Sequence, residues 1–579
     1  MRPVAVAMVN AGRPSYHSSR TLANETTIAS PSRELRPAST LILARDAPDG
    51  IEVLMVRRAA AAAVLGGAYV FPGGALDDTD HRADAAARVH GLDDSLASER
   101  LALPTGGLAF WLAAVRETFE EAGVLLARHR DGTALRPDVA AAVHAARASL
   151  CAGDVGFAAL LAAHDLVVDA RDIAYLDHWI TPPIRARRFD TRFFVACQPP
   201  GQDALHDSAE TTEAVWTAPA RMVARANRGD AELAIPTRSV LESLARVATV
   251  AELIVQARAQ RSIPAKRPCV AQGRRGEQLF RPGDAAYHEV RWSDPDESMR
   301  TSYDLVPGVP KRLDPRVVRV IAPNPGAMTG PGTNTYLVGT DALAVIDPGP
   351  AIDAHVQATL AAAWAPIRWV LCTHTHRDHS PAAQLLAAAT GAVVIGRPAP
   401  DDASQDRAFA PSRLAAHDDR LAIGGTTLRM LQTPGHASNH VCYLLEETGM
   451  LFTGDHVMQG STVVINPPDG NLRDYLRSLE ALLTLDFAII APGHGYLIGA
   501  PHDEIRRLLR HRQWREARVL DALRRAPRAR LDALVDTVYA EVDPRVKHAA
   551  ARSLLAHLIK LQEDGVVAQH DDGYALTAR

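Results

Sequence analysis

Three histidines and an aspartate crowd the stretch THTHRDHS (373–380), which directly follows the apolar run WVLC. In an extended strand end, His374 and His376 fall on one face, where both imidazoles can reach one ion. Asp378 and His379 follow on the loop and can reach a neighbouring ion. Imidazole and carboxylate ligands suit Zn²⁺, Mn²⁺ or Fe²⁺, which lower the pKa of a water molecule and polarise an ester, amide or phosphoryl oxygen. The spacing predicts a hydrolytic metal centre, and the alternative is a solvated loop that binds nothing.

Three later stretches repeat this arrangement of an apolar strand followed by a potential ligand. LQTPGHASNH offers His436, LFTGDHV offers Asp455 and IIAPGHG offers His494. Each ligand lies beside Gly or Pro, as expected for a loop at a strand end. A single such histidine would be unremarkable, but several in order favour one shared site.

Residues 313–510 resemble the metallo-β-lactamase-fold hydrolases in these motifs. The resemblance implies a four-layer αβ/βα sandwich with two Zn²⁺ ions, or with Mn²⁺ or Fe²⁺ in their place. It implies that one ion is held by His374, His376 and His436. The second would be held by Asp378, His379 and His494, with Asp455 bridging the two. Asp347 matches an early family motif, and its expected role is to buttress the ligand loops.

Two further stretches narrow the branch of this family. TGPGTNTYLVG (329–339) and PPDGNLRDYLRSLEAL (467–482) resemble the branch that includes a mitochondrial endoribonuclease. That analogy places Thr333 and Asn334 at the substrate entrance, and the alternative is that they form only a β-turn. Glyoxalase II thioesterases share the metal motif, so the motif does not choose the substrate.

A second group of acids lies on FWLAAVRETFEEAGVLLAR (110–128), which has the periodicity of an amphipathic helix. Glu117, Glu120 and Glu121 are spaced i, i+3 and i+4 and therefore share a face, where they repel one another unless a cation neutralises them. Oxygen ligands of this kind suit Mg²⁺ or Mn²⁺. Arg116 can pair with Glu120 at i+4. The alternative is an acidic helix face in solvent.

Together with YVFPGGALDDTD (69–80), this helix resembles the box of the Nudix hydrolases, which cleave nucleoside diphosphates linked to another group. The copy departs from the family in having Asp80 in place of a glutamate. It also has 35 residues between Asp80 and Arg116, where the family usually has seven. We expect this insertion to form helix and loop, as in a subgroup related to peroxisomal CoA diphosphatases. The predicted catalytic residues of the two sites are Glu117, Glu120, Glu121 and Asp378.

Basic residues outside these sites are candidates for binding phosphate. Arg185 and Arg188 lie in HWITPPIRARRFDTRFFVA (178–196), a stretch that also resembles the CoA diphosphatase subgroup. A solvated basic loop is the alternative. Residues 506–530 carry ten arginines against Glu516 and Asp521. A helix and a short hairpin follow, which indicates a winged helix that either grips single-stranded RNA or serves as a packing and homodimerisation module.

The length of 579 residues predicts several domains. The fold class is therefore α/β multidomain: a Nudix α/β/α sandwich, the four-layer metallo-β-lactamase sandwich and a C-terminal winged helix. The predicted parts are a disordered tail (1–36), a Nudix-like domain (37–265), a linker (266–312), a metallo-β-lactamase-fold domain (313–510) and a winged-helix-like domain (511–579). A net charge of −4 excludes a polyanion-binding composition for the whole chain. Five scattered cysteines indicate free thiols in a reducing, cytoplasmic setting, and no apolar run predicts a membrane span.

These patterns predict a metal-dependent hydrolase with two sites. The Nudix site is expected to act on a small-molecule nucleotide or CoA-type substrate, and the second site on RNA phosphodiesters. The alternatives are a glyoxalase II-like or acyl-CoA thioesterase in the second domain, and a Nudix domain that only senses nucleotide.

Overall fold

The computed structural model describes residues 34–61, 65–206, 210–260, 262–541 and 547–577. The chain divides into two compact units, of which the N-terminal one ends at Pro268 and the C-terminal one begins at Cys269. Residues 1–33 of the predicted tail lie outside the described part of the chain. The last residues of that predicted tail are ordered, because the first strand begins at Leu35.

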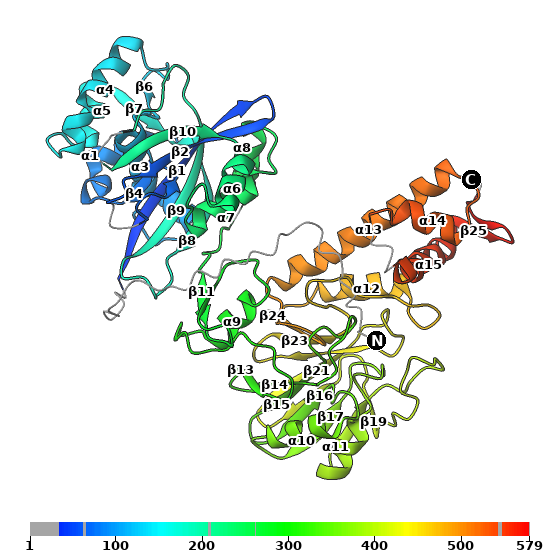
Figure 1. Cartoon of the computed structure of the whole chain (residues 1–579). Coiled ribbons are helices and arrows are strands. Elements are labelled where there is room, and N and C mark those ends of the chain that lie inside the picture. The colour runs from blue at the N-terminus through cyan, green and yellow to red at the C-terminus, as the bar shows by residue number, and fades with distance from the viewer. Residues whose placement is uncertain (1–33, 62–64, 207–209, 261, 542–546, 578–579) are drawn as a thin grey trace. The chain divides into compact units, whose positions relative to one another are not determined.

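The N-terminal unit is built on a mixed sheet with helices on both faces (Figure 1). Its strands run in the order β10 (Thr211–Thr217), β2 (Gly50–Arg58), β1 (Leu35–Ala47), β9 (Arg188–Cys197) and β8 (Ile173–Ile180), with β3 (Tyr69–Val70) and β4 (Gly73–Ala75) attached. Alternate residues of β1 enter different cores: Leu41 packs towards α3 (Leu108–Ala122), and Ile42 packs towards α7 (Ile235–Leu244) and α8 (Val250–Ala259). The helix α6 (Pro219–Arg228) lies next to α7. The α/β/α sandwich predicted for this unit is therefore confirmed.

The insertion predicted between Asp80 and Arg116 forms helix and loop as expected, together with one short strand that the prediction did not include. The segment begins at the end of η1 (Asp78–His81) and contains α1 (Ala83–Ala86), β5 (Val89–His90) and α2 (Asp94–Leu101). A small sheet joins β5 to β7 (Leu166–Asp169) and β6 (Arg128–His129), beside α4 (Pro137–Cys151), α5 (Phe157–Ala163) and η2 (Ala170–Asp172). Apolar residues of the insertion, such as Val89 and Leu101, join the same buried cluster as Trp111 of α3. The insertion thus belongs to the core of the unit.

The C-terminal unit contains two sheets packed face to face (Figure 1). One has the order β13 (Lys311–Asp314), β14 (Val317–Ile321), β15 (Asn334–Gly339), β16 (Leu343–Ile346), β17 (Ile367–Leu371), β18 (Val393–Gly396) and β19 (Arg413–Leu414). The other has β20 (Arg420–Ile423), β21 (Thr426–Gln432), β22 (Val441–Leu445), β23 (Met450–Gly454) and β24 (Ile489–Pro492).

Helices cover the outer faces of both sheets. Val317 of β14 faces the core between the sheets, while Val318 faces the outer core beneath α10 (Asp353–Ala361) and α11 (Ala383–Thr390). The second sheet is covered by α12 (Leu472–Leu482) and by the start of α13 (Pro501–Arg525). This arrangement is the predicted four-layer αβ/βα sandwich.

The segment 266–312 is largely folded, in contrast to the linker that its composition indicates. It contains β11 (Cys269–Ala271), β12 (Gln278–Phe280) and α9 (Tyr287–Ser293). Cys269, Tyr287, Val290 and Tyr303 form a small core of their own. Its strands are only three residues long, too short to give a periodic pattern in a sequence rich in Arg, Pro, Gly and Asp.

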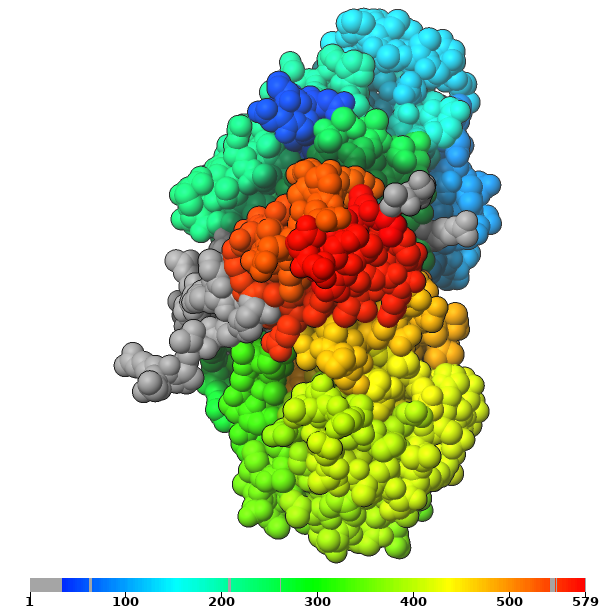
Figure 2. All heavy atoms as spheres, turned by 90° about the vertical axis from the view of Figure 1, so that its right-hand side faces the viewer, coloured from blue at the N-terminus to red at the C-terminus, as the bar shows by residue number. Residues whose placement is uncertain are grey.

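The chain ends in the predicted winged helix. Its elements are α14 (Leu531–Val538), α15 (Lys547–Glu563), β25 (Val567–His570) and β26 (Gly573–Leu576). Helix α13 continues into it without a break, so the boundary predicted after residue 510 falls inside a helix. Figure 2 shows this part in orange and red against the yellow surface around α12, where Arg473 pairs with Glu563 and Asp564. Among the described helices, none is both long and apolar enough to cross a membrane.

Candidate metal centres

The histidine and aspartate candidates of the C-terminal unit all follow strand ends. His374 and His376 come after β17, and His436 comes after β21. Asp455 directly follows β23, and His494 lies two residues after β24. Because these strands end at the same edge of the sandwich, the local pattern of each motif produces one shared cluster.

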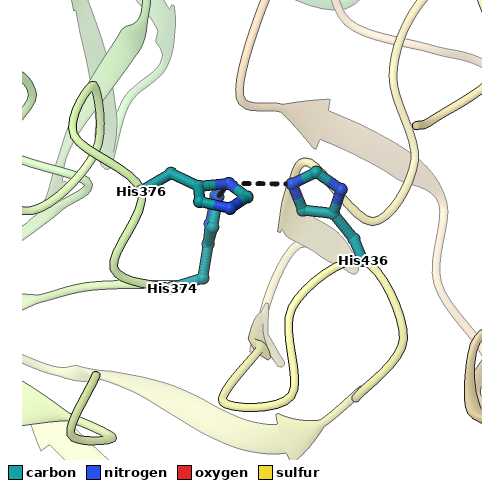
Figure 3. Close-up of side chains that lie close together, drawn as sticks. All are labelled: His374, His376 and His436. Carbon is teal, nitrogen blue, oxygen red and sulfur yellow. Dashed lines mark hydrogen bonds between the residues drawn. The ribbon is translucent and has the colours of Figure 1, made fainter. Parts of the chain in front are cut away.

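His374, His376 and His436 converge, as Figure 3 shows. Nε2 of His374 lies 2.9 Å from Nδ1 of His376, and Nε2 of His436 lies 3.1 Å from the same atom. Three ring nitrogens facing one point match the donor set of a transition-metal ion. The structure therefore brings together the residues predicted to hold the first ion.

Asp378, His379 and His494 form a second group with donor atoms within 4.8 Å of one another. Oδ2 of Asp378 lies 3.4 Å from Nε2 of His379 and 3.3 Å from Nε2 of His494. Asp455 lies between the two groups, with Oδ1 3.3 Å from Nε2 of His494 and Oδ2 3.8 Å from Nε2 of His436. This position suits a carboxylate that bridges two ions.

The remaining ring nitrogens have partners that fix the orientation of the imidazoles. Nδ1 of His379 donates to Oδ2 of Asp347 at 2.9 Å, and the same carboxylate accepts from the backbone and hydroxyl of Thr373. Nδ1 of His436 donates to the carbonyl of Val464 at 2.8 Å. Nδ1 of His494 lies 3.2 Å from the carbonyl of Gly332. The buttressing role expected for Asp347 thus has a specific geometry here.

The electrostatics of the cluster separate neutral from charged groups. Burial and the neighbouring rings of His379 and His376 lower the pKa of His374 well below its ordinary value, so its imidazole is neutral. Burial opposes the charged form of His379, but Asp378, Asp347 and Asp455 raise its pKa well above its ordinary value. Burial also opposes ionisation of Asp455, yet His494 and His379 hold the pKa of that carboxyl well below its usual range.

These residues fit divalent ions. Nε2 of His379, Nε2 of His494 and Oδ1 of Asp455 are buried and have no hydrogen-bond partner among the described residues. Leaving such atoms unpaired is costly unless a ligand satisfies them. Bound ions would supply Lewis acidity and lower the pKa of a water molecule. The chain's own contribution is to fix the donor atoms and to keep their partners buried.

Thr333 and Asn334, predicted at a substrate entrance, are both buried. The hydroxyl of Thr333 donates to Oδ2 of Asp378 at 3.3 Å. The amide of Asn334 donates to the carbonyls of Pro492 and Gly495 at 3.0 Å each. Both side chains therefore support the ligand loops, and their role at a substrate entrance stays a prediction.

Glu289 is a supporting residue that the sequence did not reveal. It lies on α9 with no exposed side-chain surface, and it accepts the backbone N–H of Leu497 at 3.0 Å, three residues after His494. Arg319 binds this carboxylate and also donates to the carbonyl of Gly495 at 3.2 Å. The only local signal was a charged residue between Tyr287 and Val290, inside a segment interpreted as a linker.

The Nudix glutamates lie on α3, which ends at Gly123 in the left-handed conformation that glycine favours. Arg116 donates one N–H to Glu117 and one to Glu120, both at 2.9 Å. Glu121 accepts the backbone N–H of Gly73 at 3.0 Å. The pairing of Arg116 with Glu120 at i+4 was expected, whereas the simultaneous bond to Glu117 was not.

Asp80, the residue that departs from the Nudix pattern, is also paired with Arg116. Its two oxygens accept from Nε and Nη2 of Arg116 at 3.0 and 2.9 Å, and both side chains are almost fully buried. The insertion therefore keeps the acid next to the arginine despite the long separation in sequence. A bidentate pair of this kind fixes the orientation of the guanidinium above α3.

The Nudix carboxylates suit a cation in their chemistry. Burial raises the pKa of Glu117 to about 7 and that of Glu121 to about 8, and burial also raises the pKa of Glu120. A divalent cation would offset the cost of ionising these buried acids. Among the described residues, however, every set of three side chains whose donor atoms already lie within 4.8 Å of one another belongs to the C-terminal unit.

The arginines predicted to bind phosphate differ in exposure. Arg185 is exposed and stays a prediction. Arg188 is buried at the start of β9, where its Nε donates to the carbonyl of Thr181 at 3.1 Å. At least part of the Arg188 guanidinium is therefore used to hold the turn before β9.

Comparison with known families agrees with this architecture. The family model of the metallo-beta-lactamase superfamily matches residues 328–494. The model of the NUDT19 Nudix domain matches residues 86–242, and that of the beta-lactamase associated winged helix domain matches residues 531–575.

Individual relatives match one unit at a time. The Beta-lactamase-like protein 2 homolog of Drosophila melanogaster is 34% identical over 45% of this chain and 92% of its own length. The Atrochrysone carboxyl ACP thioesterase of Aspergillus fumigatus is 36% identical over 37% of this chain and 67% of its own length. A solved Nudix hydrolase from Alicyclobacillus acidocaldarius is 33% identical, covering 38% of this chain and 96% of its own, with a TM-score of 0.32.

The chain therefore belongs to the metallo-β-lactamase superfamily, and it also carries a Nudix domain and a winged helix. It is a metal-dependent hydrolase.

Proposed function

We propose that the metallo-β-lactamase unit hydrolyses a thioester and that the Nudix unit cleaves the diphosphate of a nucleoside-diphosphate-linked compound such as coenzyme A. The observation that carries the proposal is the convergence of two donor groups, with Asp455 between them, at the strand ends of one unit. In this proposal the first group and the second group each hold one Zn²⁺, Mn²⁺ or Fe²⁺ ion. The Nudix glutamates hold Mg²⁺ or Mn²⁺.

The choice of a thioester rests on relatives. Two proteins that resemble the C-terminal unit are named as thioesterases, at 36% and 34% identity. An acyl derivative of coenzyme A contains both a thioester and a diphosphate, so one compound offers a bond to each unit. The fusion of the two units on one chain is consistent with such a shared substrate.

RNA phosphodiesters are the second candidate substrate for the C-terminal unit, since α13 is rich in arginine. Several of these arginines already have partners. Arg506 pairs with Asp503 at 3.0 Å, and Arg507 pairs with Glu504 at 2.6 Å on the same helix. Arg512 is buried. Paired or buried guanidinium groups have less charge to offer a phosphate backbone, so the winged helix supports a nuclease less than its arginine count indicates.

A Nudix unit that only binds nucleotide is the third candidate. The observation in its favour is Arg116, which is bonded to both Glu117 and Glu120. If this arrangement persists with nucleotide and Mg²⁺ present, the unit senses nucleotide without cleaving it. Loss of diphosphate cleavage in Glu117→Gln, with Glu99→Gln of the exposed face of α2 as control, separates an enzyme from a sensor.

The test for the C-terminal unit uses the full chain loaded with Zn²⁺ or Mn²⁺. Acetyl-CoA is assayed for release of a free thiol, which diphosphate cleavage does not produce, and single-stranded RNA is assayed for cleavage. We expect thiol release by the unmodified chain and by the control His570→Ala, an exposed residue of β25, but not by His374→Ala. RNA cleavage that depends on His374, without thiol release, would replace the thioester proposal by the nuclease candidate.

A further inference from the structure

The C-terminal unit contains a cavity of about 630 Å³ apart from the metal cluster. It is lined by residues between 274 and 321, which belong to the folded segment before β13 and to strands β13 and β14. None of the predicted metal ligands is among its lining residues. A volume of this size is within the range that holds a small-molecule ligand.

The lining of this cavity is cationic. It includes five basic residues against two acids: Arg274, Arg300, Lys311, Arg312 and Arg319 against Asp294 and Asp304.

Both acids are engaged by backbone donors. The carboxylate of Asp294 accepts from the N–H groups of Ser298 and Met299 at 2.9 and 2.8 Å. The carboxylate of Asp304 accepts from the N–H of Arg274 at 2.7 Å. The acids are therefore directed at the backbone, and no carboxylate among the described residues forms an ion pair with the exposed side chains of Arg274 or Arg300.

Two of the basic residues, the buried Arg319 and the half-buried Lys311, share a single acid. Arg319 is 1% exposed and Lys311 is 12% exposed, and both bind Glu289, which has no exposed side-chain surface. Nε of Arg319 is buried without a hydrogen-bond partner among the described residues. One buried and one half-buried cation against one carboxylate leave a net positive charge next to the cavity, which is costly unless an anion approaches it.

We propose that this cavity binds a small molecule bearing one or more phosphate groups. Arg274 and Arg300 supply guanidinium groups without ion-pair partners, and planar guanidinium groups match the geometry of phosphate oxygens. The excess positive charge of Lys311 and Arg319 attracts the same anion from the inner side. A cavity of about 630 Å³ has room for inorganic phosphate, pyrophosphate or a mononucleotide, and these are the ligands we propose.

The experiment measures hydrogen–deuterium exchange of the full chain with inorganic phosphate, pyrophosphate or AMP, because this readout locates binding within the chain. We expect slower exchange in peptides covering 294–304, and the three probes distinguish a free phosphate from a nucleotide ligand. Arg300→Ala and Arg274→Ala should each lower the apparent affinity, measured from the concentration of the probe that gives half of this protection, about tenfold. This is the loss expected for one charged hydrogen bond. The matched control is Arg275→Ala, an adjacent exposed arginine that does not line the cavity and should leave the affinity unchanged.

Three results would overturn the proposal. The first is protection confined to peptides of the metal cluster (373–380) or of α3, with no effect at 294–304. The second is equal weakening by Arg275→Ala, which would reduce the effect to general surface charge. The third is the same protection with sodium chloride at matched ionic strength, which would show screening in place of phosphate binding.

Discussion

Replacing Glu289 by glutamine should destabilise the C-terminal unit strongly, although the change adds and removes almost no volume. Glu289 accepts from Lys311 at 2.6 Å, from Arg319 at 2.6 and 2.9 Å, and from the backbone of Leu497 at 3.0 Å. The glutamine leaves the buried Arg319 and the half-buried Lys311 without an acid and weakens the support of the loop after His494.

The size of this loss of stability follows from the pKa of the Glu289 carboxyl. Burial opposes ionisation of Glu289, but Arg319 and Lys311 lower its pKa from an ordinary 4.5 to about 2. At about 1.36 kcal/mol for each pKa unit, this difference corresponds to roughly 3 kcal/mol of stability. Removing one partner of a buried ion pair costs about 3–5 kcal/mol of stability, which agrees with the value from the pKa.

The lowered pKa of Glu289 also determines how its contribution to stability changes with pH. Because the folded-state pKa is lowered, the stabilisation is present above about pH 4.5 and is lost as the pH falls through about 2. The difference in stability between the unmodified chain and Glu289→Gln should therefore narrow below about pH 4.5.

The assay is differential scanning calorimetry of the full chain, together with its zinc content. We expect the transition of the C-terminal unit to fall by about 5–10 °C in Glu289→Gln, while that of the N-terminal unit stays as an internal reference. The control is Glu446→Gln, whose exposed pair with Arg420 should contribute less than about 1 kcal/mol. Equal shifts in the two variants, or a shift for Glu289→Gln that does not change with pH, would refute the reasoning.

Three predictions concern the Nudix unit. Asp80→Asn should lower the free energy of unfolding of this unit in urea by about 1–3 kcal/mol, because Arg116 loses its bidentate partner but keeps Glu117 and Glu120; an unchanged value would contradict the pairing. Gly74→Ala should weaken Mg²⁺ binding in a calorimetric titration, because the added Cβ would lie 2.4 Å from the Glu117 carboxylate. The control is Gly156→Ala, whose added Cβ meets open space and which should leave the Mg²⁺ affinity unchanged. Mg²⁺ affinity should also rise between about pH 6 and pH 9, because burial raises the pKa of Glu117 to about 7 and protons compete with the ion below it; affinity independent of pH would argue against these ligands.

The metal cluster could be anticipated from the sequence because each ligand depends on local structure. His374, His376 and His436 follow apolar strands by a few residues, so strand ends and ligands are read from the same short stretch. The Nudix helix could be predicted for the same reason, since i, i+3 and i+4 spacing defines a helix face without any tertiary information.

The contacts that support the two sites could not be predicted in this way. Arg319 and Glu289 are 30 residues apart, and Arg116 and Asp80 are 36 apart, so only the tertiary fold brings them together. Asn334 was predicted at an entrance from the resemblance of its motif to the endoribonuclease branch, and that analogy did not indicate that the fold buries its amide against the carbonyls of Pro492 and Gly495. The folded segment around α9 was missed because its core consists of few apolar residues spread over short elements.

The central claim is that two separate hydrolytic sites lie on one chain, and its most direct test is product analysis by mass spectrometry with acetyl-CoA. The unmodified chain should give products of both thioester and diphosphate hydrolysis. His374→Ala should give only diphosphate cleavage, and Glu117→Gln only thioester cleavage. Loss of both reactions in either variant, with the fold intact, would contradict two independent sites.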